Sequence, residues 1–112
     1  MWICLNDAFL SIVADQKDPA IRLVQAQVAS HITNMFPDAN VIETPRTDYR
    51  YQASVEADVV AKVLADVIAK IRYASLTDNV RDNRLHHAYR DLSAVMHRLQ
   101  PPTPIRKSSS EL

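Results

Sequence analysis

Histidines and arginines, the side chains best suited to chemistry, are concentrated near the C-terminal end of the chain. Residues 81–100 hold three histidines and four arginines. Histidine titrates near neutral pH and binds metal ions, and arginine binds carboxylates and phosphates. A metal site on one helix needs histidines four residues apart, so that both rings face one ion. His86, His87 and His97 lie one, ten and eleven residues apart, so we expect no metal site and no cofactor.

Arg81 and His86 form a pair with a catalytic spacing. Arginine followed five positions later by histidine is the pattern of a class of all-helical ribonucleases, in which the histidine is the general base and the arginine steadies the phosphate. The pattern is only two residues long, and strands are predicted here where those enzymes have helices. Helix caps explain Asp78 and Asp82, and Ser11 has no adjacent base to activate it. We therefore expect no enzyme.

Glycine is absent from the sequence. Phosphate-binding loops, dinucleotide fingerprints, nucleophile elbows and EF-hands all need glycine for a positive φ or a close backbone approach, so these classes are excluded. The single cysteine, Cys4, excludes an internal disulfide and is typical of a reducing compartment. No apolar run approaches the ~20 residues that span a bilayer. We predict a cytoplasmic protein without a signal peptide.

Charge is unevenly distributed along a chain of zero net charge. Residues 1–66 hold nine acids and five bases, a balance of −4, whereas residues 67–112 hold four acids and eight bases, a balance of +4. Such polarity favours a partner of opposite charge. A protein partner is favoured, nucleic acid and a second copy of the chain are the alternatives, and no membrane contact is expected. The candidate partner-binding residues are Arg81, Arg84, His87, Arg90, Arg98 and Arg50.

Two helices and several strands are expected to position these residues. The last helix, residues 81–100, carries one apolar stripe at steps of four, three, four and three residues: Leu85, Tyr89, Leu92, Met96 and Leu99. We expect this stripe to hold the domain together and Asp78 to begin the helix cap. A second helix over residues 58–71 is predicted to be capped by Asp58. From Pro101 on, the composition predicts a flexible tail.

Strands are predicted at both ends of the first half of the chain. Residues 2–5 and 8–14 form short apolar runs separated by Asn6-Asp7, a turn or kink. Residues 41–44 pair in a hairpin with residues 49–56, which place Tyr49, Tyr51, Ala53 and Val55 on a buried face and Arg50, Gln52, Ser54 and Glu56 on a wet one. Residues 20–36 fit one long helix, capped by Asp18, slightly better than a strand and a short helix.

These elements predict an α+β fold, with an antiparallel sheet of about four strands and two main helices packed on one face. The length is that of one domain, over residues 1–100, followed by a tail at 101–112. Zero net charge, no glycine-built site and a polarised surface favour a non-catalytic interaction protein. The alternative is a small RNA- or DNA-binding protein, or a ribonuclease, on a ferredoxin-like sheet.

Two stretches of the chain also look familiar. The opening Trp2-Ile3 and residues 6–13 (NDAFLSIV), residues 36–37 and 48–51, and the closing run within residues 79–100 resemble a family of small, mostly uncharacterised bacterial and phage-borne proteins. The resemblance implies a strand over residues 21–28 and then a helix from Ser30 to Phe36, with Ala29 where relatives often carry glycine. Small proteins of mobile elements include inhibitors of host defence, anti-CRISPR proteins among them, so the resemblance implies such an inhibitor.

Overall fold

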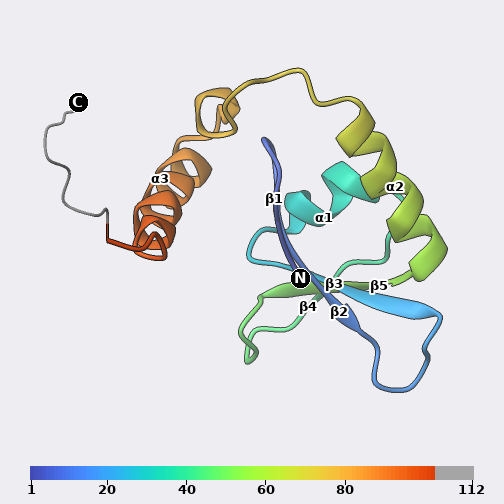
Figure 1. The fold of residues 1–112 in the computed structure, drawn as a ribbon. Coiled ribbons are helices and arrows are strands. Elements are labelled where there is room, and N and C mark those ends of the chain that lie inside the picture. Colours follow the sequence, from blue (N-terminus) through green and yellow to red (C-terminus); the bar gives the residue numbers. More distant parts are fainter. Residues whose placement is uncertain (103–112) are drawn as a thin grey trace, which may run out of the picture.

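A computed structural model describes residues 1–102 of the chain (Figure 1). The strands are β1 (Trp2–Cys4), β2 (Phe9–Ala14), β3 (Ile21–Ala26), β4 (Ile42–Glu43) and β5 (Tyr51–Glu56). The helices are α1 (Ala29–Met35), α2 (Ala57–Ala69), the short 3₁₀ helix η1 (Thr77–Asn79) and α3 (Asn83–His97). The predicted α+β class is confirmed, with five strands where about four were expected. The predicted flexible tail lies, from residue 103 on, outside the described residues.

All five strands belong to one antiparallel sheet, in the order β1-β2-β3-β5-β4. Residues that pair across antiparallel strands share a face. One face, here called the covered face, carries Leu10, Ile12, Val24, Ala26, Ala53 and Val55. The opposite face, here called the open face, carries Trp2, Cys4, Phe9, Ser11, Leu23 and Gln25.

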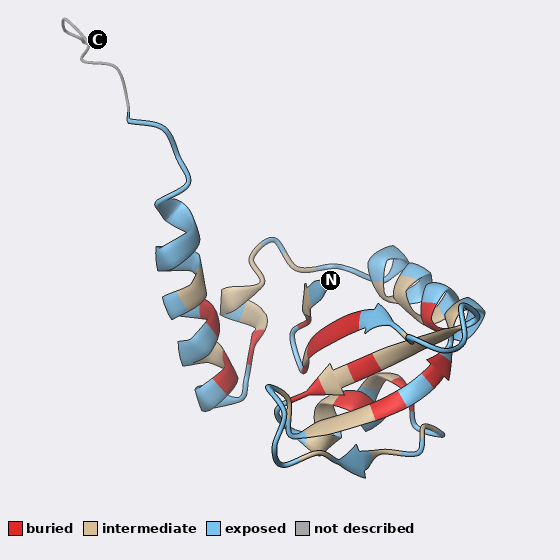
Figure 2. Cartoon of the chain, turned by 90° about the horizontal axis from the view of Figure 1, so that it is seen from below, coloured by how far each residue is buried: buried red, intermediate tan, exposed pale blue. Residues whose placement is uncertain are grey.

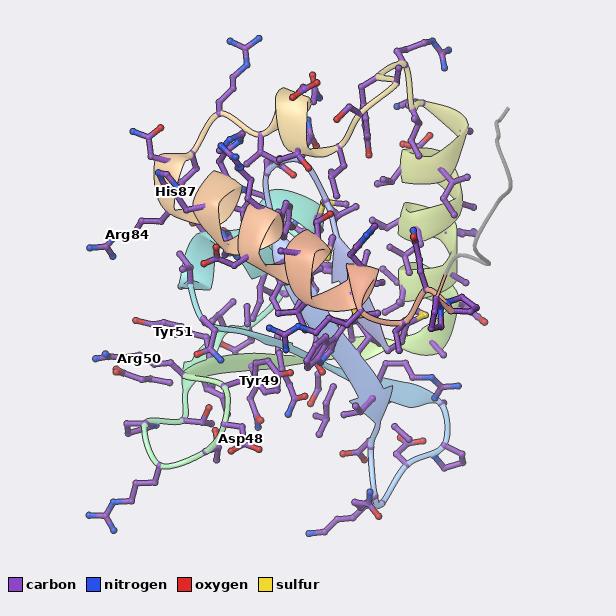
Figure 3. All side chains as sticks on the ribbon, turned by 60° about the vertical axis from the view of Figure 1, so that its left-hand side comes forward. Asp48, Tyr49, Arg50, Tyr51, Arg84 and His87 are labelled. Atoms are coloured by element: carbon purple, nitrogen blue, oxygen red, sulfur yellow. The ribbon has the colours of Figure 1, made fainter. Side chains whose placement is uncertain are left out.

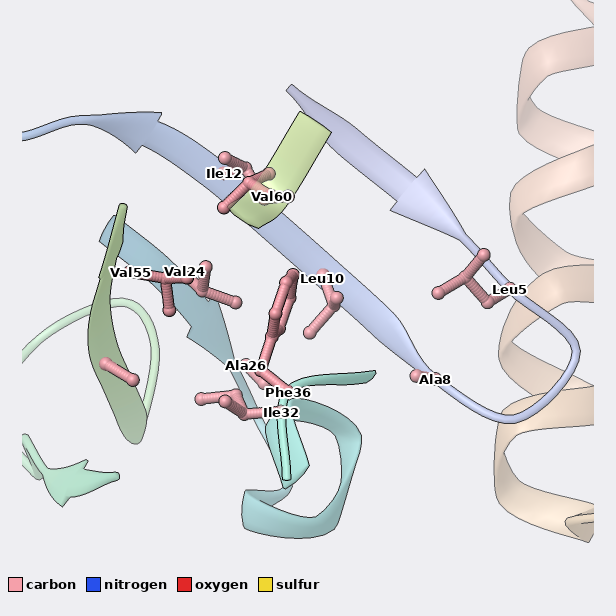
Figure 4. Packing of buried hydrophobic residues seen from close by; sticks show 11 residues of the cluster. Leu5, Ala8, Leu10, Ile12, Val24, Ala26, Ile32, Phe36, Val55 and Val60 are labelled. Atoms are coloured by element: carbon pink, nitrogen blue, oxygen red, sulfur yellow. The ribbon is translucent and has the colours of Figure 1, made fainter. Parts of the chain in front are cut away.

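Helices α1 and α2 pack on the covered face and complete the core (Figure 1). Leu10 and Val24 from the sheet and Ile32 from α1 are fully buried. Val60 of α2 lies against Ile12, and Ile32 lies with Phe36 beneath the end of β3 (Figure 4). Burial of these apolar side chains is the main favourable term in folding, so this layer is the stable body of the protein.

Residues 21–26 form the strand β3, so the preference for one long helix was wrong. β3 is hydrogen-bonded on both sides, to β2 and to β5. Its period-two pattern buries Val24 and Ala26 on the covered face. Ile21 and Val24, which also fit a helical stripe, lie in β3, whereas Ile32 and Met35 lie in α1. Val28 lies between them as the N-cap residue of α1. Asp18 caps no helix but accepts the Ala20 amide hydrogen in a turn.

The caps of the two long helices differ from the expectation. α2 begins one residue before Asp58, which lies in its first turn and makes no side-chain cap bond. There its charge still favours the positive end of the helix dipole. Asp78 lies in η1, and Asp82 caps α3 instead, through a 2.9 Å bond from the Leu85 amide to its Oδ1.

The predicted alternation along β5 is confirmed for Tyr51, Ala53 and Val55, which face the core. It is wrong for Tyr49, which precedes the strand and whose hydroxyl accepts a 2.9 Å hydrogen bond from the indole N–H of Trp2 on the open face. The backbone changes direction before Tyr51, so the period of two does not extend back to Tyr49.

Helix α3 contacts the sheet on the open face and not beside α2. Its buried residues Leu85 and Tyr89 pack against Cys4 and Phe9, whose side chains lie opposite the α1–α2 layer. The C-terminal part of α3, after Leu92, extends away from the body (Figure 2). None of the helices within residues 1–102 has the length and apolar composition to cross a membrane.

The core identified above predicts the effect of truncating Leu10. Leu10→Ala should lower the free energy of unfolding by about 2–5 kcal/mol, because it removes buried methyl groups and leaves a cavity. Val13→Ala, on the same strand with a side chain 39% exposed, should cost far less. Urea unfolding followed by circular dichroism measures both, and equal losses would contradict the assignment of the core.

Candidate functional site

The N-terminal half of α3 is anchored to the open face by a small second core. Val80, Leu85 and Tyr89 are buried together, against Cys4, Phe9 and Leu76. The Asp82 cap fixes the start of the helix next to this cluster. The anchor therefore fixes both the position and the direction in which α3 leaves the body.

Tyr89 makes the most specific contact of this anchor. Its hydroxyl oxygen lies 2.8 Å from the carbonyl oxygens of both Leu5 and Ala8, which flank the Asn6-Asp7 turn between β1 and β2. One phenol proton is shared between two acceptors. Burial raises the pKa of Tyr89, so the phenol remains neutral and can donate its proton. The predicted turn at Asn6-Asp7 is confirmed by a 2.8 Å hydrogen bond from the Leu5 amide to the Ala8 carbonyl, and α3 contacts the body at this turn.

A cleft of about 770 Å³, here called the α3 cleft, opens beside this anchor. Arg84, Leu85, Ala88, Tyr89 and Leu92 of α3 contribute to one wall, and Trp2, Phe9, Val28 and His31 contribute to the other. Its volume falls within the range of small-ligand and peptide pockets, and mostly apolar linings with a few polar groups are typical of such sites.

Trp2 and His31 are cleft residues that the sequence did not point to. Trp2 is largely exposed and packs edge-on to Phe9, with ring centroids 5.6 Å apart. The Nδ1 atom of His31 accepts a 3.2 Å hydrogen bond from the Phe9 amide, so in this arrangement the ring proton is on Nε2. His31 is distant in sequence from the other histidines, and only the pairing of β1 with β2 brings Trp2 near α3.

The structure places the six predicted partner-binding residues in three different locations. Arg81 and Arg84 line the α3 cleft. His87, Arg90 and Arg98 are exposed and are not among its lining residues. Figure 3 shows Arg84 and His87 on the N-terminal part of α3.

Arg50 is separate from the helix residues and belongs to the β4–β5 hairpin (Figure 3). Its Nε atom donates a 3.0 Å hydrogen bond to Glu43, and its guanidinium carbon lies 6.0 Å from the Tyr51 ring centroid. Both members of this ion pair are exposed, so the pair contributes little to stability.

The catalytic pattern of Arg81 and His86 is not assembled in the cleft. Arg81 lines the cleft, whereas His86 does not. The Nδ1 atom of His86 lies 2.9 Å from the carbonyl oxygen of Thr77. A carbonyl only accepts, so His86 carries its proton on Nδ1 there. Among the described residues, no three His, Cys, Asp or Glu side chains converge as metal ligands.

The second half of the α3 stripe does not contact the body. Leu92 is half-buried, while Met96 is 51% and Leu99 74% exposed, and Val95 beside them is 48% exposed. The expectation that the whole stripe holds the domain together is therefore wrong for Met96 and Leu99. The helix extends past the body after Leu92, and its far half is exposed on all sides (Figure 2).

Comparison with known proteins found no match for this chain among family models, curated proteins or solved structures. The features that bear on function are therefore those of α3 and its cleft. The two features that require an explanation are the exposed bases of α3 and its exposed apolar residues.

Removing the Tyr89 hydroxyl tests the anchor. Tyr89→Phe should lower the free energy of unfolding by about 1–3 kcal/mol, because two turn carbonyls lose a buried donor. It should also speed amide exchange in the turn around Asn6. Tyr73→Phe is the matched control, because Tyr73 is half-buried and no hydrogen bond of its hydroxyl is present in residues 1–102. Equal effects of both variants would contradict the anchor.

Alkaline pH should weaken the same anchor. The pKa of Tyr89 is raised in the folded state, so its contribution is complete below the pKa of an unfolded tyrosine and is lost as pH rises above about 10. The predicted loss is about 1.4 kcal/mol per pH unit, because the unfolded state then binds fewer protons.

The measurement compares two proteins that both carry Cys4→Ala, because burial also raises the pKa of the Cys4 thiol. One retains Tyr89 and the other carries Tyr89→Phe. Urea unfolding from about pH 9 to about pH 11 should show the loss only in the first protein. Parallel curves for both proteins would show that Tyr89 ionisation is not involved.

Proposed function

We propose that this chain is a non-catalytic protein-interaction module that presents a basic helix surface to an acidic partner protein. The surface, here called the basic surface, consists of the following residues at or next to α3: Arg81, Arg84, His87, Arg90 and Arg98. Arg50 lies on a different part of the molecule and is an auxiliary candidate at most.

The observation that carries this proposal is that the arginines of the basic surface have no ion-pair partner. The two ion pairs within residues 1–102 are Arg50–Glu43 and Lys70–Asp66, and neither involves α3. All five members of the basic surface are exposed. Asp91 is the one acid between Asn83 and His97. Exposed guanidinium groups without partners are suited to bidentate contacts with the carboxylates of another protein.

The placement of α3 supports the same proposal. Its anchor uses the buried residues Leu85 and Tyr89, whereas Arg90 and Arg98 are exposed and do not line the cleft beside that anchor. Charges spread along a projecting helix reach a partner surface early and accelerate association. The acidic N-terminal part of the chain lowers the net charge and limits non-specific binding.

The family resemblance adds a class of partner to this proposal. An inhibitor carried by a phage or mobile element needs no chemistry, because it acts by occupying a surface of a host defence protein. A compact body with one exposed basic helix is compatible with that mode of action.

Nucleic-acid binding is the second candidate, and one observation favours it. Trp2, Phe9 and Tyr49 place aromatic rings on or beside the open face, near the cleft that Arg81 and Arg84 line. Aromatic rings and arginines together bind single-stranded nucleic acid by stacking and phosphate contact. Asp7 and Asp82 line the same cleft and repel phosphate, so we rank this function second.

The basic surface is tested by affinity capture from a bacterial lysate, with quantitative mass spectrometry as readout. Arg90→Glu with Arg98→Glu should reduce capture of the specific partner at least tenfold, because attraction to carboxylates becomes repulsion. Lys17→Glu with Lys62→Glu is the matched control, since it changes the net charge equally at exposed sites elsewhere. Equal loss in both variants would contradict the proposal.

A parallel titration with a labelled single-stranded RNA distinguishes the second candidate. Salt-sensitive RNA binding that the Arg90 and Arg98 variant abolishes would replace the protein-binding assignment. No RNA binding, together with lost protein capture, is the result we expect.

A further inference from the structure

We propose that a second copy of this chain binds the apolar side of α3, through antiparallel pairing of two α3 helices about a two-fold axis. The pairing surface, here called the α3 seam, is the part of the apolar stripe that the body leaves exposed: Leu92, Val95, Met96 and Leu99. The seam shares no residue with the basic surface, and this inference does not depend on the function proposed for that surface.

The spacing of the stripe is that of a coiled coil. Steps of four, three, four and three place Leu85, Leu92 and Leu99 at d positions of a heptad and Tyr89 and Met96 at a positions. The body already buries the first turn and a half of this repeat, through Leu85 and Tyr89. The repeat continues beyond the body with the same period through Leu92 and Met96, and Leu99 follows in the turn after the helix ends at His97. The seam thus has the pattern by which one helix packs along another.

The residues beside the seam favour an identical partner. Positions e and g, which flank a coiled-coil contact, are occupied by His86, Ala88, Ser93 and Val95, none of them an arginine, lysine or acid. Charged residues at these positions normally select the partner. Arg84, Arg90 and Arg98 are at outer b and c positions, so two copies pair without bringing like charges together. An acidic foreign helix would find no charge beside the seam to recognise.

The α3 cleft is placed to receive an apolar side chain of the second copy. An antiparallel pair with its axis near Ala94 places Leu92 opposite Met96 of the second copy. It also brings Leu99 of the second copy to the level of Ala88 and Tyr89, at the cleft that Trp2 and Val28 line. Each copy carries both a cleft and a Leu99 side chain. A two-fold pair therefore places the Leu99 of each copy in the cleft of the other.

The inferred dimer would also leave His87, Arg90 and Arg98 of both copies exposed, because these residues do not line the cleft that the second copy enters. A bivalent partner would then be bound more tightly than by one copy alone. The seam and the basic surface are therefore separable by mutation, since they use different residues of the same helix.

Sedimentation velocity on the full chain tests the inference. The wild-type protein should sediment at twice the chain mass of 12.7 kDa at micromolar concentration. Met96→Glu with Leu99→Glu should sediment as a monomer, with unchanged circular dichroism because both side chains are exposed in the single chain. Arg90→Glu with Arg98→Glu should remain dimeric, which separates this result from that of the proposed function.

Disulfide trapping tests the geometry of the pair. In a Cys4→Ala background, Ser93→Cys lies beside the proposed axis and should cross-link two chains under mild oxidation. Asp91→Cys, on the outer side of the same turn, should not.

Three outcomes would overturn the inference. The first is a monomeric wild-type chain, including one in which its own residues 103–112 protect Met96 from solvent. The second is a dimer that persists with Met96→Glu and Leu99→Glu, and the third is equal cross-linking through positions 91 and 93.

Discussion

One buried phenol joins helix α3 to the turn between β1 and β2. The hydroxyl of Tyr89 must find an acceptor because burial leaves it no water, and the carbonyls of Leu5 and Ala8 are those acceptors. Their location at the Asn6-Asp7 turn fixes the N-terminal half of α3 beside β1 and β2. Because only this half of α3 is anchored, its bases and the apolar residues of its C-terminal part remain exposed.

The two faces of the sheet accordingly have different roles. α1 and α2 bury the covered face over the larger core and supply most of the stability. The open face is contacted by α3 through a smaller core, and a cleft remains beside that contact. The sheet therefore has a well-packed core on one side and a partly open surface with a cleft on the other.

Local patterns in the sequence predicted most of the fold. The alternation of Tyr51, Ala53 and Val55 identified β5, and the apolar periodicity identified both long helices. Apolar periodicity could not show that Met96 and Leu99 project beyond the body. It indicates which residues share one side of a helix, but it does not indicate what that side contacts. The α3 cleft was also beyond prediction, since Trp2 reaches it through the pairing of β1 with β2 and His31 comes from α1. The bases of α3 were recognisable by composition alone.

The body holds α3 by its N-terminal half only. Amide hydrogen exchange along α3, measured in dilute and in concentrated solution, tests it most directly. In dilute solution we predict strong protection from residue 86 to residue 90 and weak protection from residue 93 to residue 97, with the second segment gaining protection in concentrated solution. Equal and strong protection of both segments in dilute solution would contradict the account.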